Sequence, residues 1–408
     1  MNRRQFLHQS SLFTATSLVS IGAHGWASRS IAAVNPNPPR LIVVFLRGAI
    51  DGLSVVIPYQ EPTYYTDRPT IAIAPPGQPN GALDLDGQFG LHPALAPLQP
   101  LWEQKSLAFV HACGSRDETR SHFDAQDYLE SGTPGIKATR DGWMNRLLGV
   151  ISDQNPLQAV SVGATTPRIL LGKRAVANIA SGRSAGNRMQ IDKPPIATAF
   201  DRLYANNDAL GRAYREGRVA RTELLKDLDA ETKMANNGAT LPNGFPGDAQ
   251  RLARLIARDP RIQLSFLAVG GWDTHINQGA SQGQLARNLA QLGKGLVALQ
   301  SGLGDAYQQT TIVVMSEFGR TVKENGNGGT DHGHGNVMWL LGGGIRGGTV
   351  YGDWAGLETA QRYQGRDLAV TTDFRDVLGT VLTQRLAVDV GKLGQVFPGY
   401  TAQTLSFG

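Results

Sequence analysis

Six short and almost unbroken apolar runs occur along the chain, and each is typical of a strand buried on both faces of a sheet. The runs cover residues 41–46, 107–112, 158–162, 263–269, 311–315 and 337–341. Most of them end in Gly, Asp, Ser or His, and helix-like patterns lie between them. Because strands that alternate with helices build mostly parallel sheets, the pattern predicts an α/β domain. Such sheets carry their sites at the carboxyl ends of the strands.

Amphipathic patterns predict helices at 95–102, 121–130, 141–150, 284–299 and 372–384. A further stretch at 200–233 is rich in Ala, Leu, Arg and Glu and is expected to form one or two exposed helices. Asn, Gly and Pro break this pattern over 236–247. We interpret the region around 196–247 as a helical insertion into a single domain that spans residues 34–408.

The first 33 residues have the layout of a removable export signal. Arg3 and Arg4 form a basic start, a weakly apolar stretch covers 10–23, and small residues up to Ala33 suit cleavage. The run RRQFL resembles the twin-arginine export signal. The apolar stretch is shorter than the roughly 20 residues that cross a bilayer, so no stable transmembrane anchor is expected. We therefore expect the twin-arginine translocase to export the protein to the periplasm or outside the cell.

The charge of the whole chain suggests nucleic acid as a partner, but the charge of the mature chain does not. The formal net charge of the 408 residues is +5, which invites a nucleic-acid interpretation. Cleavage after residue 33 removes three arginines and no acidic residue, which lowers the charge to +2. Without a basic motif or a recognised module, no nucleic-acid partner is expected. Cys113 is the only cysteine, so the fold forms without an internal disulfide.

Acidic residues and histidines gather just after the predicted strands. Four of them follow the runs at 41–46, 263–269 and 311–315, and two lie in the glycine-rich loop 325–335: Asp51, Asp273, His275, Glu317, His332 and His334. Imidazole nitrogens and carboxylate oxygens together suit Zn²⁺, and carboxylate-rich sites also suit Mn²⁺, Mg²⁺ or Ca²⁺. The sequence therefore predicts a divalent metal site. Each motif alone also fits a structural interpretation, such as an Asp-Gly turn or a hydrogen-bonded glycine-rich turn.

The segment RDETRSHFD at 116–124 precedes a predicted helix and has two interpretations. Ser121 with Asp124 fits a capping box in outline, although Glu or Gln is the usual partner. A helix N-terminus also attracts anions, so Ser121 or Thr119 is a candidate nucleophile. In that case Arg120 would hold anion oxygens in a bidentate manner.

The order of these residues along the chain resembles the alkaline phosphatase-like superfamily, which includes phosphatases and sulfatases. A more specific resemblance is to a twin-arginine-exported bacterial family, domain of unknown function 1501. It covers nearly all of the mature chain and rests on the strings LIVVFLRGAIDGL, RSHFDAQDYLESGTPG, GGWDTH, MSEFGRTVKENGNGGTDHGHG and VYGDW. The resemblance implies an alkaline phosphatase-like three-layer sandwich, with a mostly parallel central sheet and helices on both faces.

The resemblance also implies roles for individual residues. It makes Asp51 a ligand of one metal, and it assigns a second metal to Asp273, His275 and either His332 or His334. Glu317 takes the place of the second acidic ligand, and Ser121 that of the nucleophile or of a phosphate or sulfate contact. The superfamily often has Asp-His where this chain has Glu317-Phe318, so one imidazole is missing. Either His122 or His334 replaces it, or a single metal binds.

Together these features predict an exported metal-dependent hydrolase of phosphate esters, in preference to sulfate esters. A metal would lower the pKa of Ser121 or of a bound water, and Arg120 or Arg320 would stabilise the equatorial oxygens. The expected partner is an anionic ester substrate or an anionic glycan. The segment around Cys113 lacks the Pro and the spacing of the formylglycine sulfatase signature. The alternative, which the missing Asp-His pair favours, is a non-catalytic envelope protein that uses the same fold for binding or assembly.

Overall fold

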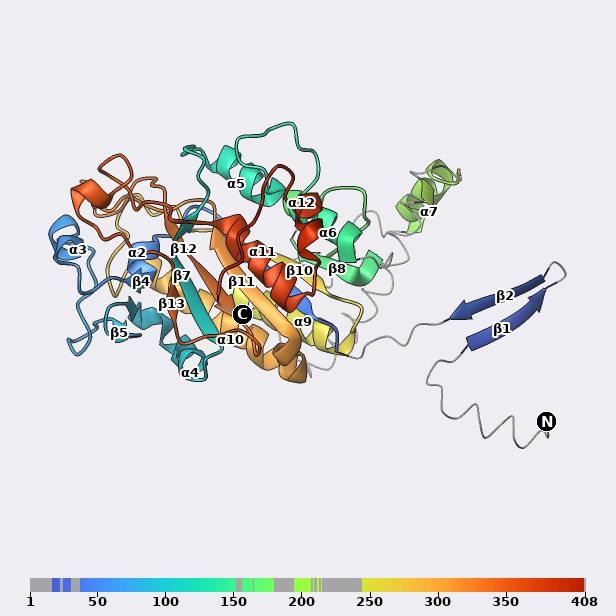
Figure 1. Cartoon of the computed structure of the whole chain (residues 1–408), viewed down its shortest axis with the longest axis horizontal. Helices are drawn as coiled ribbons and strands as arrows, with labels where there is room; N and C mark the ends of the chain where they lie inside the picture. Colours follow the sequence, from blue (N-terminus) through green and yellow to red (C-terminus); the bar gives the residue numbers. More distant parts are fainter. Residues whose placement is uncertain are drawn as a thin grey trace. The chain divides into compact units, whose positions relative to one another are not determined.

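The computed structural model describes residues 17–22, 25–30, 37–151, 156–163, 165–179, 194–206, 208, 211–212, 214 and 244–406. The chain forms two compact units, residues 1–38 and 39–408 (Figure 1). In the first unit, strand β1 (Ser17–Gly22) pairs antiparallel with β2 (Gly25–Ser30). This hairpin lies in the segment that the sequence assigns to an export signal, and that assignment stays a prediction.

A nine-stranded sheet forms the centre of the second unit. Eight strands follow one another in the order β13-β7-β12-β11-β3-β10-β8-β9, and β14 also pairs with β7. Their bounds are β3 (Arg40–Leu46), β7 (Leu107–Gly114), β8 (Ala159–Val162), β9 (Ala177–Ile179), β10 (Leu264–Val269), β11 (Thr310–Ser316), β12 (Asn336–Leu341), β13 (Val350–Tyr351) and β14 (Thr372–Asp373). Strand β12 runs antiparallel to both of its neighbours, and every other pair is parallel. The predicted α/β class with a mostly parallel sheet is confirmed.

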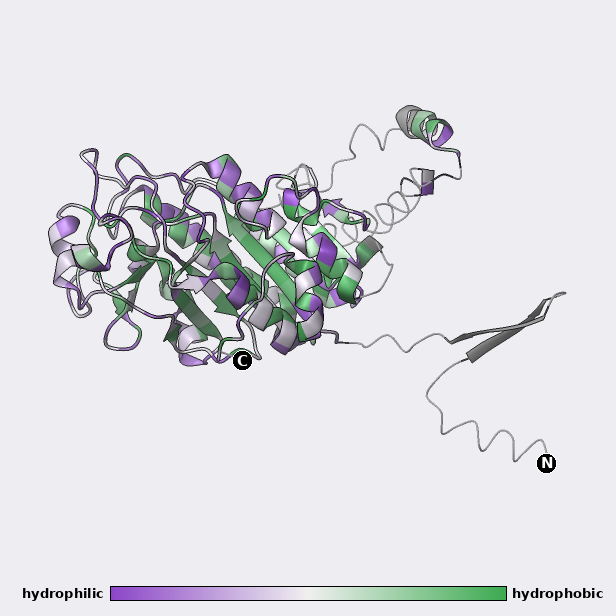
Figure 2. Cartoon of the chain, turned by 45° about the horizontal axis from the view of Figure 1, so that its top comes forward, coloured by the Kyte–Doolittle hydropathy of each residue, from purple (hydrophilic) through white to green (hydrophobic). Residues whose placement is uncertain are grey.

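Helices cover both faces of this sheet, so the unit has three layers (Figure 1). One layer contains the 3₁₀ helix η2 (Pro93–Leu98), α4 (Gln99–Glu103), α9 (Phe245–Arg258) and α10 (Gln284–Leu303). The other contains α5 (His122–Ser131), α6 (Trp143–Ile151), α11 (Phe374–Arg385) and α12 (Leu393–Val396). Successive side chains of a strand point to opposite faces. Accordingly, alternate residues of β3 enter separate apolar cores, and the hydrophobic colour of Figure 2 concentrates on the sheet.

All five predicted helices appear, with bounds that differ by a few residues. The first is divided between η2 and α4, because Pro97 and Pro100 interrupt regular helical hydrogen bonding. Of the predicted insertion, α7 (Pro194–Leu203) is described, whereas 215–243 lies outside the described residues. Smaller elements complete the unit: helices α2 (Gly52–Val55) and α3 (Pro62–Asp67), and a sheet of β4 (Val56–Ile57), β6 (Gly90–Leu91) and β5 (Leu83–Asp84). No helix among the described residues is long and apolar enough to span a membrane.

The register of the sheet decides where the predicted site residues meet. In β3, Leu46 lies beside Val269 of β10 and Ser316 of β11. The three loops that follow these residues therefore leave the sheet side by side at its carboxyl edge. They carry Asp273 and Glu317, so the placement expected for a parallel sheet is present.

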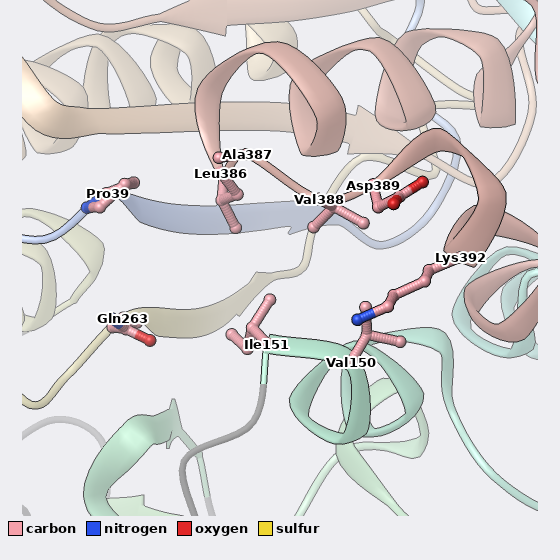
Figure 3. Close-up of a pocket in the computed structure, with 9 residues that line it drawn as sticks. All are labelled: Pro39, Val150, Ile151, Gln263, Leu386, Ala387, Val388, Asp389 and Lys392. Carbon is pink, nitrogen blue, oxygen red and sulfur yellow. The ribbon is translucent and has the colours of Figure 1, made fainter.

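A pocket of about 310 Å³ lies at the opposite, amino-terminal edge of the same strands (Figure 3). Pro39 and Gln263, which directly precede β3 and β10, line it together with the end of α6 and the segment after α11. Its charged residues are Asp389 and Lys392. It holds no histidine and shares no residue with the carboxyl edge, so we place the candidate chemistry elsewhere.

Candidate metal centre

Close backbone packing holds the loops of the carboxyl edge together. Gly48, after β3, has a φ of +115°, and a Cβ atom on it would lie 2.7 Å from the backbone nitrogen of Asp273. Only glycine fits such a position without a shift of its neighbour. The glycine-rich loop pairs with the segment after β11, because the backbone N–H of Gly333 donates to the Gly319 oxygen and that of Gly319 donates to the His334 oxygen.

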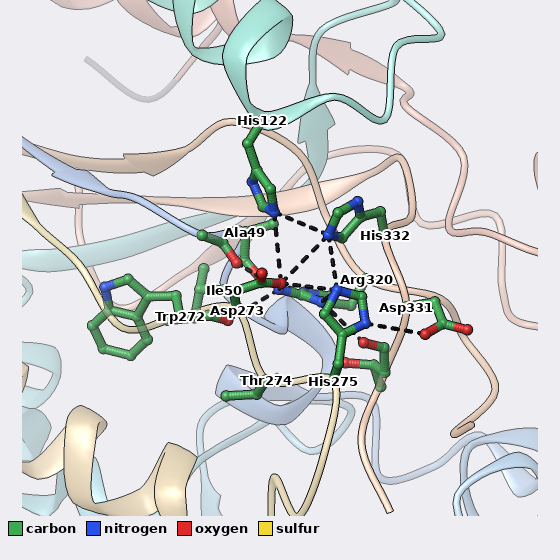
Figure 4. A network of polar contacts seen from close by, with 12 residues as sticks. Ala49, Ile50, His122, Trp272, Asp273, Thr274, His275, Arg320, Asp331 and His332 are labelled. Atoms are coloured by element: carbon green, nitrogen blue, oxygen red, sulfur yellow. Dashed lines mark hydrogen bonds and ion pairs between the residues drawn. The ribbon is translucent and has the colours of Figure 1, made fainter. Parts of the chain in front are cut away.

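Four side chains from these segments and from the start of α5 direct one atom each toward a common point (Figure 4). We call them the histidine cluster: His122, Asp273, His275 and His332. The Nε2 atom of His332 lies 2.9 Å from Nε2 of His122 and 2.9 Å from Nε2 of His275. The Oδ1 atom of Asp273 lies 3.0 Å, 3.4 Å and 3.6 Å from Nε2 of His275, His332 and His122. Among the described residues, His122, Asp273 and His332 form a possible metal-binding group.

The opposite ring nitrogen of each histidine has its own acceptor. Each Nδ1 atom lies within hydrogen-bond distance of an oxygen, namely Glu317 Oε1 for His122 at 2.8 Å, Asp331 Oδ1 for His275 at 3.1 Å and the backbone oxygen of Arg120 for His332 at 2.9 Å. A neutral imidazole has one N–H, so a proton on Nδ1 leaves a lone pair on Nε2. If all three rings carry their proton on Nδ1, three lone pairs face one point, and such a set suits a cation. Metal-bound histidines typically donate their other N–H to a carboxylate or carbonyl in this way.

The spacing of the four donor atoms also fits a metal ion. Five of the six separations among these atoms, all except the one between His122 and His275, range from 2.9 to 3.6 Å. Tetrahedral coordination with bonds of about 2.0–2.1 Å separates its donors by roughly 3.3 Å. His122, Asp273 and His332 therefore form a group that would hold one metal ion through two imidazole nitrogens and one carboxylate oxygen, and His275 lies beside this group with its Nε2 atom 2.9 Å from Nε2 of His332.

Arg320 fixes Asp273 from the buried side of the cluster. Its guanidinium donates to Asp273 Oδ1 at 2.5 Å and to backbone oxygens, including those of Gly48 and Ala49, both at 2.6 Å, and its Nη1 atom lies 3.4 Å from Nε2 of His275. Burial alone would raise the pKa of Asp273, but the hydrogen bond and the charge of Arg320 hold that pKa below its usual value. These acceptors use the donors of Arg320, so Arg320 orients Asp273. The sequence led us to expect that Arg320 would bind substrate oxygens, and in the structure it does not extend toward them.

Glu317, predicted as a metal ligand, lies behind the cluster. It is buried, and its Oε1 accepts hydrogen bonds from the Gly48 backbone at 2.8 Å, from His122 Nδ1 at 2.8 Å and from Gln126 at 2.9 Å. Burial would raise the pKa of Glu317, but the bonds from His122 and Gln126 keep it lowered. The same bond to Glu317 raises the pKa of His122. Glu317 therefore holds the ring of a ligand in place.

We expect Glu317→Gln to weaken metal binding by about tenfold, because the amide keeps the shape but loses the charge that orients and polarises His122. The dissociation constant is measured by competition with a chromogenic chelator. Glu324→Gln is the matched control, since the side-chain hydrogen bonds of Glu324 among the described residues are to the exposed Thr70 and to its neighbour Ile71. An affinity that Glu317→Gln leaves unchanged would contradict the positioning role.

Asp51 is not brought to the cluster, although the resemblance made it a metal ligand. Its buried carboxylate pairs with both Nη atoms of the buried Arg68, at 2.6 and 3.0 Å. Ser54 and Gln278 each donate to Oδ2 at 2.7 Å. Burial would raise the pKa of Asp51, but the charge and hydrogen bonds of Arg68 lower it. A guanidinium thus occupies the place where the sequence suggested a metal, and the role of Asp51 in the structure is to bind Arg68.

His334 and the guanidinium of Arg120 also lie apart from the cluster. The ring of His334 stacks on Tyr363 with centroids 4.2 Å apart. The Arg120 guanidinium donates to Asp367 at 2.9 Å and to Gln364 at 3.0 Å, and only its backbone oxygen reaches the cluster. Between the two alternatives in the sequence, the geometry therefore selects His332 and not His334.

Ser121 caps helix α5, as one of its two interpretations predicts. Its Oγ accepts from the backbone N–H of Asp124 at 3.5 Å, and the residue is exposed. No contact joins this oxygen to the cluster among the described residues. The structure thus gives Ser121 a capping role, and its assignment as nucleophile stays a prediction.

We expect Ser121→Ala to lower the free energy of unfolding by at most about 1 kcal/mol, because the cap bond is long. Metal affinity should remain unchanged, because Ser121 provides no ligand. Chemical denaturation and chelator competition measure the two quantities on the same protein. A loss of metal binding without a loss of stability would contradict the capping assignment.

Two members of this site have larger roles than the sequence indicated. His122 was predicted only as a replacement for a missing imidazole, and Asp331 was not among the predicted site residues. The sequence feature that could have identified His122 is its position directly after the capping residue Ser121. The first residue of this helix lies near the carboxyl ends of the strands. Asp331 adjoins His332 in the sequence but accepts from His275, so its role depends on how the glycine-rich loop meets the segment after β10.

The comparisons with known proteins agree with one part of the sequence prediction. The family described as protein of unknown function (DUF1501) matches residues 38–387. The chain belongs to the DUF1501 family. The family that the motifs predicted is thereby confirmed. No curated protein matches the DUF1501 chain significantly.

Solved structures resemble the DUF1501 chain only distantly. The sulfatase PsFucS1 from Pseudoalteromonas sp. is 14% identical, with 90% of this chain and 71% of that chain covered and a TM-score of 0.40. A protein in the alkaline phosphatase superfamily from Vibrio parahaemolyticus is 9% identical, with 85% and 66% covered and a TM-score of 0.39. Alkaline phosphatase from the Antarctic bacterium TAB5 is 11% identical, with 77% and 95% covered and a TM-score of 0.34.

Proposed function

We propose that this protein is a metal-dependent hydrolase of phosphate esters, in preference to sulfate esters. The observation that supports the proposal is the convergence of three Nε2 atoms and Asp273 Oδ1 at the carboxyl edge of the sheet. The cluster is accessible, because the side chains of Asp273 and His275 are 48% and 37% exposed. An ester can therefore reach it from solution.

The donor set favours zinc as the metal. Imidazole nitrogens with one carboxylate oxygen are typical zinc ligands, whereas Mg²⁺ and Ca²⁺ prefer oxygen. When bound, such an ion acts as a Lewis acid toward an ester oxygen and lowers the pKa of a coordinated water. His122 and His332 would hold it through Nε2, with their Nδ1 protons fixed by the acceptors described above, and Asp273 would hold it through Oδ1.

The remaining steps depend on the residues of the chain. Arg320 keeps Asp273 ionised, so this carboxylate is available as a metal ligand beside the reacting ester. Ser121 Oγ is directed at its own helix, and we therefore assign the attacking oxygen to water. Phe318 is buried against the rings of His122 and His332 and limits the access of water to the cluster from the protein interior.

Metal analysis and an ester panel test the proposal directly. We expect the purified full chain to bind one zinc per molecule and to hydrolyse chromogenic phosphate esters faster than sulfate esters. Asp273→Ala should lose turnover, and Ser121→Ala should retain it. Failure to bind zinc or manganese at micromolar concentration would overturn the proposal. Loss of turnover in Ser121→Ala with metal retained would instead restore Ser121 as the nucleophile.

A second candidate function is a non-catalytic envelope protein. With His275 as a fourth donor, the cluster would close a tetrahedral site, as in structural zinc sites that keep no open position. In this case the full chain would bind zinc in a one-to-one ratio, and chelation would lower its melting temperature. No phosphate or sulfate ester of the panel would turn over.

We also propose export by the twin-arginine translocase to the periplasm or outside the cell, on the basis of the sequence pattern. The paired Arg3 and Arg4 support this location. Replacement of both arginines by lysine should retain the full chain in the cytoplasm, as measured by cell fractionation. Unchanged export of this variant would refute the twin-arginine route.

A further inference from the structure

The buried amide of Gln278 joins two of the loops that carry the metal ligands. Gln278 is fully buried and lies in the segment between β10 and α10, as Asp273 does. Its Oε1 accepts from the hydroxyl of Thr274 at 2.8 Å and from the hydroxyl of Thr330 at 2.9 Å. Thr274 directly follows Asp273, and Thr330 lies two residues before His332 in the glycine-rich loop. One acceptor atom therefore links the loop of Asp273 to the loop of His332.

The nitrogen of the same amide is held by the buried carboxylate of Asp51. Gln278 Nε2 donates to Asp51 Oδ2 at 2.7 Å, and Arg68 in turn holds this carboxylate. A neutral amide suits this place, because it donates to a carboxylate and accepts from two hydroxyls at the same time. A glutamate here would bring a second carboxylate against Asp51, and an apolar side chain would take the acceptor away from two buried hydroxyls.

We infer that Gln278 is a positioning residue of the metal centre, which sets the separation of Asp273 and His332 by joining Thr274 to Thr330. This inference rests on the proposed function and gives a role to a residue that supplies no ligand. Asp273 Oδ1 lies 3.4 Å from His332 Nε2, close to the roughly 3.3 Å that separates two donors in tetrahedral zinc coordination. Backbone hydrogen bonds also connect the two loops. The loops should therefore stay folded without the amide, while the separation of the two donors changes.

Metal binding by the full chain with Gln278→Met tests this role. Methionine keeps the length of glutamine, but it has no N–H donor and its sulfur is only a weak acceptor. We expect the dissociation constant for zinc, measured by competition with a chromogenic chelator, to rise about tenfold. Thr330→Val removes one of the two hydroxyl bonds without a change of size, and it should raise the constant about threefold. This second variant decides the test if Gln278→Met does not fold.

Cobalt(II) supplies a readout that a loss of stability alone would not change. The visible absorption of bound cobalt(II) depends on the geometry of its donor atoms. We expect the bands of the cobalt-loaded Gln278→Met protein to differ in position or intensity from those of the unchanged protein. Thr330→Val should change the same bands to a smaller extent.

Asn145→Leu and Thr310→Val are the matched controls. Asn145 is a buried amide of α6 that donates to two backbone oxygens, and Thr310 is a buried threonine at the start of β11 that donates to one. Both variants should lose stability but keep the zinc affinity and the cobalt bands. Unchanged zinc affinity and bands in the folded variants of Gln278 and Thr330, or equal changes in the controls, would overturn the inference and leave the proposed function standing. If the unchanged protein bound neither metal, the proposed function itself would fall.

Discussion

Replacing His332 by alanine is expected to weaken zinc binding by more than about 100-fold, which exceeds the effect of losing an outer partner. The Nε2 atom of His332 lies 2.9 Å from the Nε2 atoms of both other histidines of the cluster, so its removal opens the centre of the donor set. The variant should fold normally, because its side chain is partly exposed. Competition with a chromogenic chelator measures the dissociation constant.

His334→Ala is the matched control for this experiment. The two histidines lie two residues apart in the same loop, but the ring of His334 stacks on Tyr363, and in the described part of the chain no side-chain contact joins it to the cluster. Burial lowers the pKa of His334, which suits a neutral ring in a packed position. We expect the zinc affinity of this variant to match that of the unchanged protein. Equal losses in the two variants would refute the assignment of His332.

Six of the nine strands of the central sheet could be predicted, because a strand buried on both faces forms a continuous apolar run, whereas the short strands β9, β13 and β14 were not predicted. All six apolar runs coincide with strands. The antiparallel direction of β12 was not predicted, since an apolar run carries no sign of direction. A signal was present: no helical pattern separates β11 from β12, and a parallel crossover needs one. Helix α9 was missed although Leu252, Leu255 and Ile256 have helical spacing.

The position of the candidate site followed from the sequence, but the direction of its side chains did not. Parallel strands predict that Asp273, His275 and Glu317 meet at one edge. Whether Glu317 faces a metal or the Nδ1 atom of a histidine depends on the register of the Gly48 loop, which no local pattern encodes. The choice of His332 depends likewise on backbone pairing of the glycine-rich loop.

Replacing Arg68 by methionine is expected to lower the free energy of unfolding by about 3–5 kcal/mol. Both Arg68 and Asp51 are fully buried, and the change leaves the carboxylate of Asp51 without its counter-charge. Urea denaturation measures the loss. Because the pKa of Asp51 is lower in the folded protein than in the unfolded chain, the pair stabilises the protein fully at a pH above 3.8, the ordinary pKa of an aspartate. This stabilisation disappears as the pH falls below that value through the folded pKa.

The double variant Asp51→Asn with Arg68→Met separates a structural pair from a metal ligand. Asp51→Asn removes the buried carboxylate charge that Arg68→Met leaves unpaired. The double variant should therefore regain at least about 1 kcal/mol of unfolding free energy relative to Arg68→Met alone, since the effects of substitutions within one network are not additive. Ser54 and Gln278 remain as hydrogen-bond partners for the asparagine. Zinc affinity of the folded double variant should be unchanged, because Asp51 supplies no donor to the cluster. A large loss of zinc affinity without recovery of stability would mean that Asp51 acts as the ligand that the family resemblance implied.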